Sequence, residues 1–234
     1  MASNRLIILI FIILLIPSLT GAQTTTKEDV VAVGFSTLNT LNSVPAGWGL
    51  DRKKGKAHLR MVKEGATSFL NMVCKQSAFG IEKAVKVNVK EYPFLNWTWK
   101  AVKLPQGGDV RSQETDDQAI QIYLAFTATG FPAQLNTPVL SYIWDNEAPK
   151  EWTGRSPQIG GSKFRYLVMR NKTDRLNEWS TEKRNVYQDY QKLFSDLQGG
   201  ESPGPIEGIS LYINTHHTGS LAESHIGNIY FSRQ

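Results

Sequence analysis

Short runs in which apolar and polar residues alternate are the feature that most constrains the fold of this chain. In FLNWTWKAV (residues 94–102), Leu95, Trp97 and Trp99 share one face of an extended strand, because successive side chains point to opposite faces. The run QAIQIYLAFTA (residues 118–128) places four large apolar residues on one face: Ile120, Ile122, Leu124 and Phe126. A period of two residues predicts strands with one buried face, as in packed antiparallel sheets.

About ten strand-like runs follow one another along the chain, separated by turn-forming residues. Besides the two above, they are DVVAVGFS (29–36), AHLRMVKE (57–64), TSFLNMVCK (67–75), KAVKVNVKEY (83–92), PVLSYIWDN (138–146), KFRYLVMRN (163–171), IEGISLYIN (206–214) and HIGNIYFSR (225–233). Apolar residues at helical spacing predict one short amphipathic helix within residues 181–197. The chain is therefore predicted to be mainly β, an antiparallel sandwich or jelly roll of the galactose-binding-like kind.

The N-terminal segment has the three parts of a secretory signal peptide. Arg5 precedes an unbroken apolar run over residues 6–16, and small residues follow up to Ala22. The run is shorter than the roughly 20 apolar residues that span a bilayer. We expect cleavage after Ala22, a single domain over residues 23–234, no stable membrane insertion after cleavage, and a secreted or periplasmic protein.

Charge and cysteine content limit which binding partners and which disulfides the chain can have. The chain holds 26 Lys and Arg against 21 Asp and Glu, which is only a mild excess of positive charge. The sequence also contains no arginine-rich face, so we expect no nucleic-acid partner. The basic stretch DRKKGKAHLR (51–60) is interpreted as a solvated turn and strand edge. Cys74 is the only cysteine, which excludes an internal disulfide, and its apolar surroundings predict a buried thiol.

The stretch INTHHTGS (213–220) holds two of the four histidines, and His225 follows. In a continuing strand, His216 and His217 would point to opposite faces, so only one of them could join a shared site. His217 and His225 could meet across the loop between two neighbouring strands, with Glu223 as the one local carboxylate. Because a zinc site needs three or four ligands, we expect no metal site and no cofactor.

Carboxylates offer a second set of candidates. Asp116 and Asp117 precede a strand and are typical either of a turn or of a rim that binds a cation or ligand hydroxyls. A carboxylate-dependent hydrolase would need two carboxyl groups about 5–10 Å apart, with Glu182 and Asp189 as further candidates. Arg184 is expected to tie the helix to the sheet through a carboxylate.

The six tryptophans suggest carbohydrate binding, because sugar rings dock onto exposed aromatic faces while nearby polar groups bind their hydroxyls. Trp152 in the loop KEWTGRSP and Trp144 at the end of a strand suit such a platform, whereas alternation favours the core for Trp97 and Trp99. The predicted ligand-binding residues are Trp144, Trp152, Asp116, Asp117, Arg184, Asn214 and His217.

The order of several motifs resembles the secreted bacterial proteins grouped as domain of unknown function 3047. The motifs are FLNWTWKA, DDQAIQIYLAF, LSYIWDN, EWSTEKRNVYQDYQKLF, IEGISLYINT and IGNIYF. The resemblance implies a secreted, β-sandwich-like protein and no established activity. Family members usually carry an acidic run where this chain has NTHHT: Asn214 and His216 replace aspartates, and His217 stands where asparagine is common.

Three functions remain open from the sequence. We favour a secreted binding module with a glycan or another small molecule as ligand, and binding rather than catalysis. The alternatives are a carboxylate-dependent enzyme acting on an envelope polysaccharide and a structural or assembly protein of the cell envelope. An aromatic row facing solvent on a concave sheet would favour the binding module. Two convergent, unpaired carboxylates in a cleft would favour the enzyme. An uncovered strand edge or a large apolar patch would favour the third.

Overall fold

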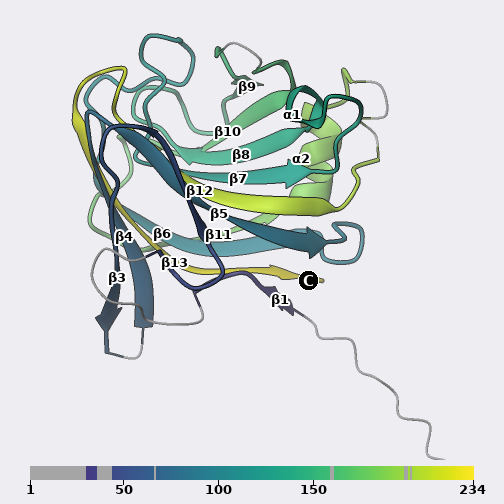
Figure 1. The fold of residues 1–234 in the computed structure, drawn as a ribbon, viewed down its shortest axis with the longest axis horizontal. Helices are drawn as coiled ribbons and strands as arrows, with labels where there is room; N and C mark the ends of the chain where they lie inside the picture. The colour runs from purple at the N-terminus through teal and green to yellow at the C-terminus, as the bar shows by residue number, and fades with distance from the viewer. Residues whose placement is uncertain (1–29, 36–43, 66, 159–160, 198–199, 201) are drawn as a thin grey trace, which may run out of the picture.

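The chain folds into two β-sheets that pack face to face (Figure 1). The computed structural model describes residues 30–35, 44–65, 67–158, 161–197, 200 and 202–234. The expected signal peptide lies outside the described residues. Within the described residues, no helix is both long enough and apolar enough to cross a membrane.

The first sheet has six strands within the described residues. In spatial order they are β11 (Ser180–Asn185), β6 (Phe94–Lys103), β13 (Leu221–Ser232), β4 (Thr67–Lys75) and β3 (His58–Glu64), and β1 (Val30–Ala32) pairs with β13. All of these pairings are antiparallel.

The second sheet has seven strands within the same residues. Their order is β2 (Gly49–Lys54), β5 (Ala78–Val87), β12 (Ile206–Asn214), β7 (Ile120–Phe126), β8 (Val139–Trp144), β10 (Phe164–Arg170) and β9 (Thr153–Arg155). The pairing of β8 with β10 is parallel, because the chain between them passes through β9 at the sheet edge before it returns. The predicted mainly antiparallel sandwich of jelly-roll type is confirmed, with this one parallel pair.

The inward faces of both sheets build one hydrophobic core. The residues predicted to share a face on β6 are fully or almost fully buried there: Leu95, Trp97 and Trp99. Two aromatic contacts join the sheets. Trp97 stacks on Tyr142 of β8 with ring centroids 5.2 Å apart, and Trp99 lies 5.8 Å from Trp144. Such pairs contribute about 0.5–1.5 kcal/mol beyond the buried area, so they fasten one sheet to the other.

The predicted helix is shorter than its sequence pattern suggested. Helix α2 covers Val186–Leu193, whereas residues 180–185 form strand β11 on the edge of the first sheet. Asn185 ends the strand and caps the helix, because its side chain accepts a hydrogen bond from the backbone N–H of Gln188 at 3.0 Å. Two further short helices occur in the described residues, α1 (Ala133–Asn136) and the 3₁₀ turn η1 (Gly161–Lys163).

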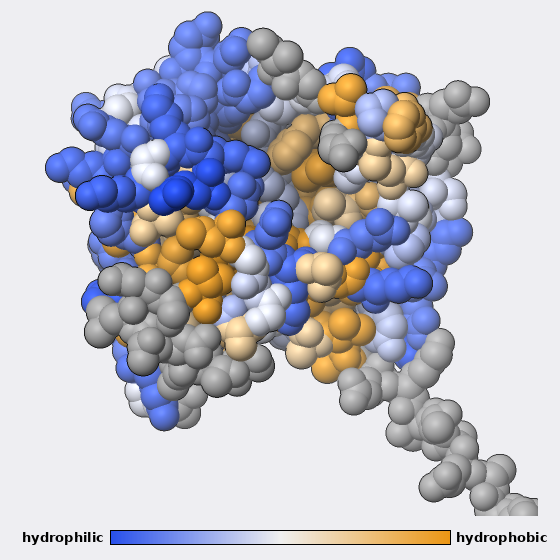
Figure 2. Space-filling model, viewed as in Figure 1, coloured by the Kyte–Doolittle hydropathy of each residue, from blue (hydrophilic) through white to orange (hydrophobic). Residues whose placement is uncertain are grey.

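The loop that carries α1 presents apolar side chains to solvent. Phe131 is 96% exposed and Leu135 is 63% exposed. Figure 2 shows hydrophobic residues at the place that α1 occupies in Figure 1.

Candidate functional site

The outer face of the seven-stranded sheet holds a cavity of about 420 Å³. Its floor is formed by residues that alternate with core residues on β7 and β12. Gln121 and Tyr123 flank the core residue Ile122, and Tyr212 follows the core residue Leu211. The pleat of the strands therefore turns these polar and aromatic side chains away from the core and into the cleft.

Four aromatic rings form a continuous row across this cleft, which we call the aromatic row: Tyr212, Tyr123, Phe164 and Tyr166. The rings of Tyr212 and Tyr123 stack with centroids 5.6 Å apart and planes 27° apart. Phe164 meets Tyr123 edge-on at 4.8 Å and lies 5.0 Å from Tyr166. Tyr166 is buried, whereas the other three residues are half-buried.

Two small residues make room for these rings. Gly80 on β5 pairs with Tyr212 on β12, and a Cβ atom at Gly80 would lie 2.7 Å from the Tyr212 ring. Ser141 on β8 pairs with both Tyr123 and Tyr166, which lie on the strands on either side. The short serine side chain lets the rings of β7 and β10 meet above β8.

A hydrogen-bond network fixes the polar groups beside the aromatic row. Tyr123 donates from its hydroxyl to Oε1 of Gln121 at 2.6 Å, and Gln121 Nε2 donates to Oδ1 of Asn214 at 2.8 Å. Asn214 Oδ1 also accepts the backbone N–H of Gln118 at 3.0 Å, and its Nδ2 donates to the backbone carbonyl of Asp116. The amide orientations are therefore set before any ligand arrives.

Asp116 is a buried carboxylate at one end of the cleft. Its oxygens accept hydrogen bonds from Gln118 Nε2 at 3.1 Å and from Gln158 Nε2 at 2.9 Å. Burial raises the pKa of Asp116, and these two hydrogen bonds oppose the rise. The carboxyl group can accept a hydrogen bond from a ligand hydroxyl, or donate one when it is protonated.

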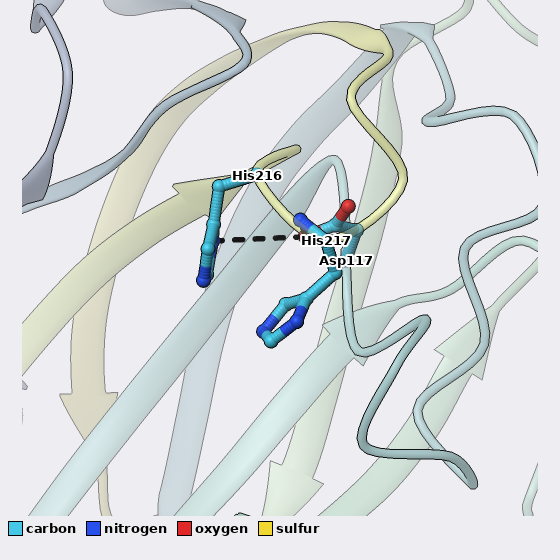
Figure 3. A group of neighbouring side chains, drawn as sticks. All are labelled: Asp117, His216 and His217. Atoms are coloured by element: carbon cyan, nitrogen blue, oxygen red, sulfur yellow. Dashed lines mark hydrogen bonds and ion pairs between the residues drawn. The ribbon is translucent and has the colours of Figure 1, made fainter.

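The turn after β12 brings the two adjacent histidines together. Strand β12 ends at Asn214, so His216 and His217 do not alternate across a strand, and their ring centroids lie 3.9 Å apart. Figure 3 shows both rings beside Asp117. Burial, together with the neighbouring His217, lowers the pKa of His216.

Asp117 holds this turn in place. The side chain is fully buried, and its Oδ2 accepts the backbone N–H of Thr218 at 2.7 Å and the Thr218 hydroxyl at 2.8 Å. Its Oδ1 accepts the backbone N–H of His217 at 3.3 Å. Asp117 therefore positions the histidines.

The expected meeting of His217 with His225 is wrong, because β12 and β13 lie in different sheets. His225 instead stacks on Phe69 with centroids 4.7 Å apart, and its Nε2 lies 3.6 Å from a carboxylate oxygen of Glu223.

Of the predicted ligand-binding residues, Asp116, Asn214 and His217 line the cleft, and Asp117 lies beside it. Trp144 does not offer a platform: it is fully buried in the core, and its indole N–H donates to the backbone carbonyl of Asn171 at 3.3 Å. Sequence reasoning placed it near solvent because it ends a strand.

Two other predicted ligand-binding residues lie outside the cleft. Trp152 is half-buried and packs against a small cluster that includes Tyr166. Arg184 forms two hydrogen bonds with the carboxylate of Asp189, at 2.9 and 2.6 Å, and so ties β11 to α2 as its tethering role required.

Two of the four carboxylates considered for hydrolysis, Glu182 and Asp189, are occupied by structural partners. Asp189 accepts the Tyr142 hydroxyl at 2.8 Å in addition to Arg184. Glu182, which lies on β11 and not on the helix, accepts the Trp99 indole N–H at 3.1 Å and pairs with Arg170. Carboxylates held in this way are poorly suited to acid–base catalysis, so this pair does not support a hydrolase.

The aromatic row itself was missed, although the sequence contained a signal for it. The alternation that identified the core face of residues 118–128 also assigns Gln121 and Tyr123 to the opposite face. The same reasoning on residues 206–214 turns Tyr212 outward. What the sequence did not provide was the pairing of β7 with β12, which brings these rings side by side.

The fold and the cleft define the class of this protein: a jelly-roll β-sandwich with an open aromatic cleft on one sheet. The chain belongs to the family described as protein of unknown function DUF3047, whose model matches residues 46–230. No curated protein matches the chain significantly.

Solved structures with similar folds include the family 11 carbohydrate-binding module of the cellulase Lic26A-Cel5E from Clostridium thermocellum. The identity is 10%, the TM-score is 0.43, and the match covers 86% of this chain and 96% of that one. A second is the xyloglucanase domain of NopAA, a type three effector from Sinorhizobium fredii, in complex with cellobiose. Here the identity is 8%, the TM-score is 0.41, and the coverage is 81% and 95%.

Proposed function

We propose that this protein binds a carbohydrate chain in the cleft of the seven-stranded sheet. The observation that carries the proposal is the aromatic row, in which Tyr212, Tyr123 and Phe164 are half-buried residues that line the cleft. Sugar rings present flat C–H faces, and these lose contact with water when they stack on aromatic side chains. A row of several rings suits a ligand with repeated rings better than a single small molecule.

The polar groups beside the row support the same ligand class. Gln121, Asn214 and Asp116 offer amide and carboxyl groups whose orientation is fixed by mutual hydrogen bonds. Fixed donors and acceptors bind sugar hydroxyls at a low cost in side-chain entropy. A cavity of about 420 Å³ falls within the range of small-ligand sites, which is about 300–1,000 Å³.

We also infer that binding takes place outside the cytoplasm. The signal-peptide pattern of residues 1–22 supports export, and residues 23–234 are then the mature, single-domain protein. The mass of the protein recovered from a bacterial periplasm or medium tests this. A chain that begins at Gln23 supports the inference, whereas a full-length chain retained in the cytoplasm contradicts it.

The test of carbohydrate binding uses the mature chain, residues 23–234, and two aromatic variants. Affinity electrophoresis in gels containing soluble β-glucans, xylans or bacterial exopolysaccharides identifies a ligand, and calorimetry measures its Kd. We expect Tyr212→Ala to weaken binding about 10- to 100-fold, since removing one buried contact of this size costs about 1.5–3 kcal/mol.

The matched control is Trp179→Ala, because Trp179 is 40% exposed on the opposite side of the sandwich and is the rival sugar platform. Its removal should leave the Kd unchanged. Retention of full affinity in Tyr212→Ala, or its loss in Trp179→Ala, would overturn the assignment to the cleft. The absence of retardation by every polysaccharide would overturn the ligand class.

A further inference from the structure

The turn at the end of the cleft gathers three side chains that can each offer one metal ligand. They are Asp117, His216 and His217, and one potential ligand atom from each lies within 4.8 Å of the other two. Figure 3 shows the three side chains converging from two segments that are far apart in the sequence. Both histidines line the cleft, whereas Asp117 lies behind them and is fully buried.

The carboxylate of Asp117 is held so that one oxygen faces the histidines. Its Oδ2 accepts two hydrogen bonds from Thr218, which leaves Oδ1 with only the 3.3 Å bond from the His217 backbone. Thr218 thus fixes the orientation of the carboxylate, as the outer partners of metal ligands do. A carboxylate oxygen carries two lone pairs, so Oδ1 can accept a further partner.

The imidazole of His216 presents the complementary group. Its Nδ1 is buried, has no hydrogen-bond partner among the described residues, and lies 3.9 Å from Asp117 Oδ1. A buried nitrogen without a partner costs free energy, and a bound cation would remove that cost.

The spacing is close to that of a bound ion. Ligand atoms 2.0–2.1 Å from a tetrahedral zinc lie about 3.3 Å from one another. The 3.9 Å between His216 Nδ1 and Asp117 Oδ1 therefore needs to shorten by about 0.6 Å on binding, and the ligand atoms of all three residues already lie within 4.8 Å of one another. Rotation of the partly exposed His216 ring supplies such a movement without a change in the backbone.

We propose that Asp117, His216 and His217 bind a divalent zinc ion at the end of the cleft. Two imidazoles and one carboxylate suit zinc, whereas Ca²⁺ requires six to eight oxygen ligands. Three protein ligands leave one position for water or for an oxygen of a bound ligand. Zinc binding is a separate property from the proposed carbohydrate binding. It does not depend on a bound carbohydrate, because all three metal-binding side chains belong to this chain.

The experiment uses the mature chain without a histidine tag, treated with a chelator and then titrated with ZnCl₂ by calorimetry. We expect one zinc ion per chain. His216→Ala and His217→Ala should each weaken the zinc affinity about 100-fold or more, because even outer-shell changes cost about 10- to 100-fold. Titration with Co²⁺ should give the visible absorption of a low-symmetry site, and each histidine variant should lose it.

The matched control is His58→Ala, which removes an exposed histidine on β3 of the other sheet and should leave the zinc affinity unchanged. Circular dichroism of the metal-free variants checks their folding. His216→Gln, which keeps the size of the side chain, replaces any alanine variant that unfolds. No zinc binding by the wild type, or equal binding by both histidine variants and the wild type, would overturn the proposal.

Discussion

Gln121 on β7 donates a hydrogen bond of 2.8 Å to the side-chain oxygen of Asn214 on β12, directly beside the aromatic row. The same oxygen also accepts the backbone N–H of Gln118, so one amide serves two buried donors. Asn214 stands at the last position of β12, where the chain leaves the sheet for the histidine turn. One side chain therefore connects the floor of the cleft to its end.

The first prediction concerns this connection. Asn214→Ala should lower the free energy of unfolding by about 2–6 kcal/mol, because two buried donors lose their acceptor at about 1–3 kcal/mol each. Urea denaturation measures the loss. Asn228→Ala, which truncates an exposed asparagine on β13, serves as the control and should change stability by less than about 0.5 kcal/mol. Equal stabilities for the two variants would contradict the buried network.

Much of the sandwich could be predicted because alternation is a local property. Leu95, Trp97 and Trp99 are in the core as expected, since a strand with a two-residue period must bury one face. Strand β2 carries charged residues and was interpreted as a turn and strand edge. Strand β11 was taken for helix, because its polar residues gain their strand conformation only by pairing with β6.

The site was less accessible to sequence reasoning because it depends on which strands are neighbours. Asp116 and Asn214 were identified as polar residues near turns, but nothing local showed that their segments meet. The two histidines follow the predicted strand run 206–214, but nothing local showed that both would lie beside Asp117. In the structure Asp117, about 100 residues away in the chain, bends this segment into a turn.

The second prediction uses a buried acid outside the cleft. Asp145 is fully buried, and burial raises its pKa to about 7, although hydrogen bonds from the backbone N–H groups of Ala148 and Val110 oppose the rise. In the unfolded chain the carboxyl group of Asp145 has the ordinary aspartate pKa of 3.8. Between about pH 4 and pH 7 the unfolded chain is ionised at this side chain while the folded chain keeps its proton. This contribution to stability therefore falls as pH rises, by up to about 1.4 kcal/mol per pH unit.

Asp145→Asn removes this titration, so the free energy of unfolding of the variant minus that of the wild type should increase from pH 5 to pH 8. Urea denaturation at several pH values measures the difference, in which the other titrating groups cancel. The variant can be less stable overall, because an amide nitrogen would face one of the two backbone donors. A difference that stays constant over this pH range would show that Asp145 is ionised throughout.

The third prediction concerns the close approach of β5 and β12 beneath the aromatic row. A Cβ atom at Gly80 would lie 2.5 Å from the backbone oxygen of Leu211 and 2.7 Å from the ring of Tyr212. Gly80→Ala should therefore force the two strands apart locally and lower the free energy of unfolding by about 1–3 kcal/mol, the usual cost of overpacking. Because the same contact sets the Tyr212 ring, the affinity for a carbohydrate should fall as well, at temperatures well below Tm.

Gly49→Ala is the matched control, because a Cβ atom at Gly49 on the neighbouring strand β2 would meet its nearest atoms, in Glu82, at 3.8 Å. That distance is an ordinary van der Waals contact, so the variant should unfold within about 0.5 kcal/mol of the wild type. Thermal denaturation compares the three proteins, and calorimetry gives their Kd values. If Gly80→Ala lost stability but bound carbohydrate normally, the position of Tyr212 would not determine affinity, and Tyr123 and Phe164 would have to supply the stacking surface.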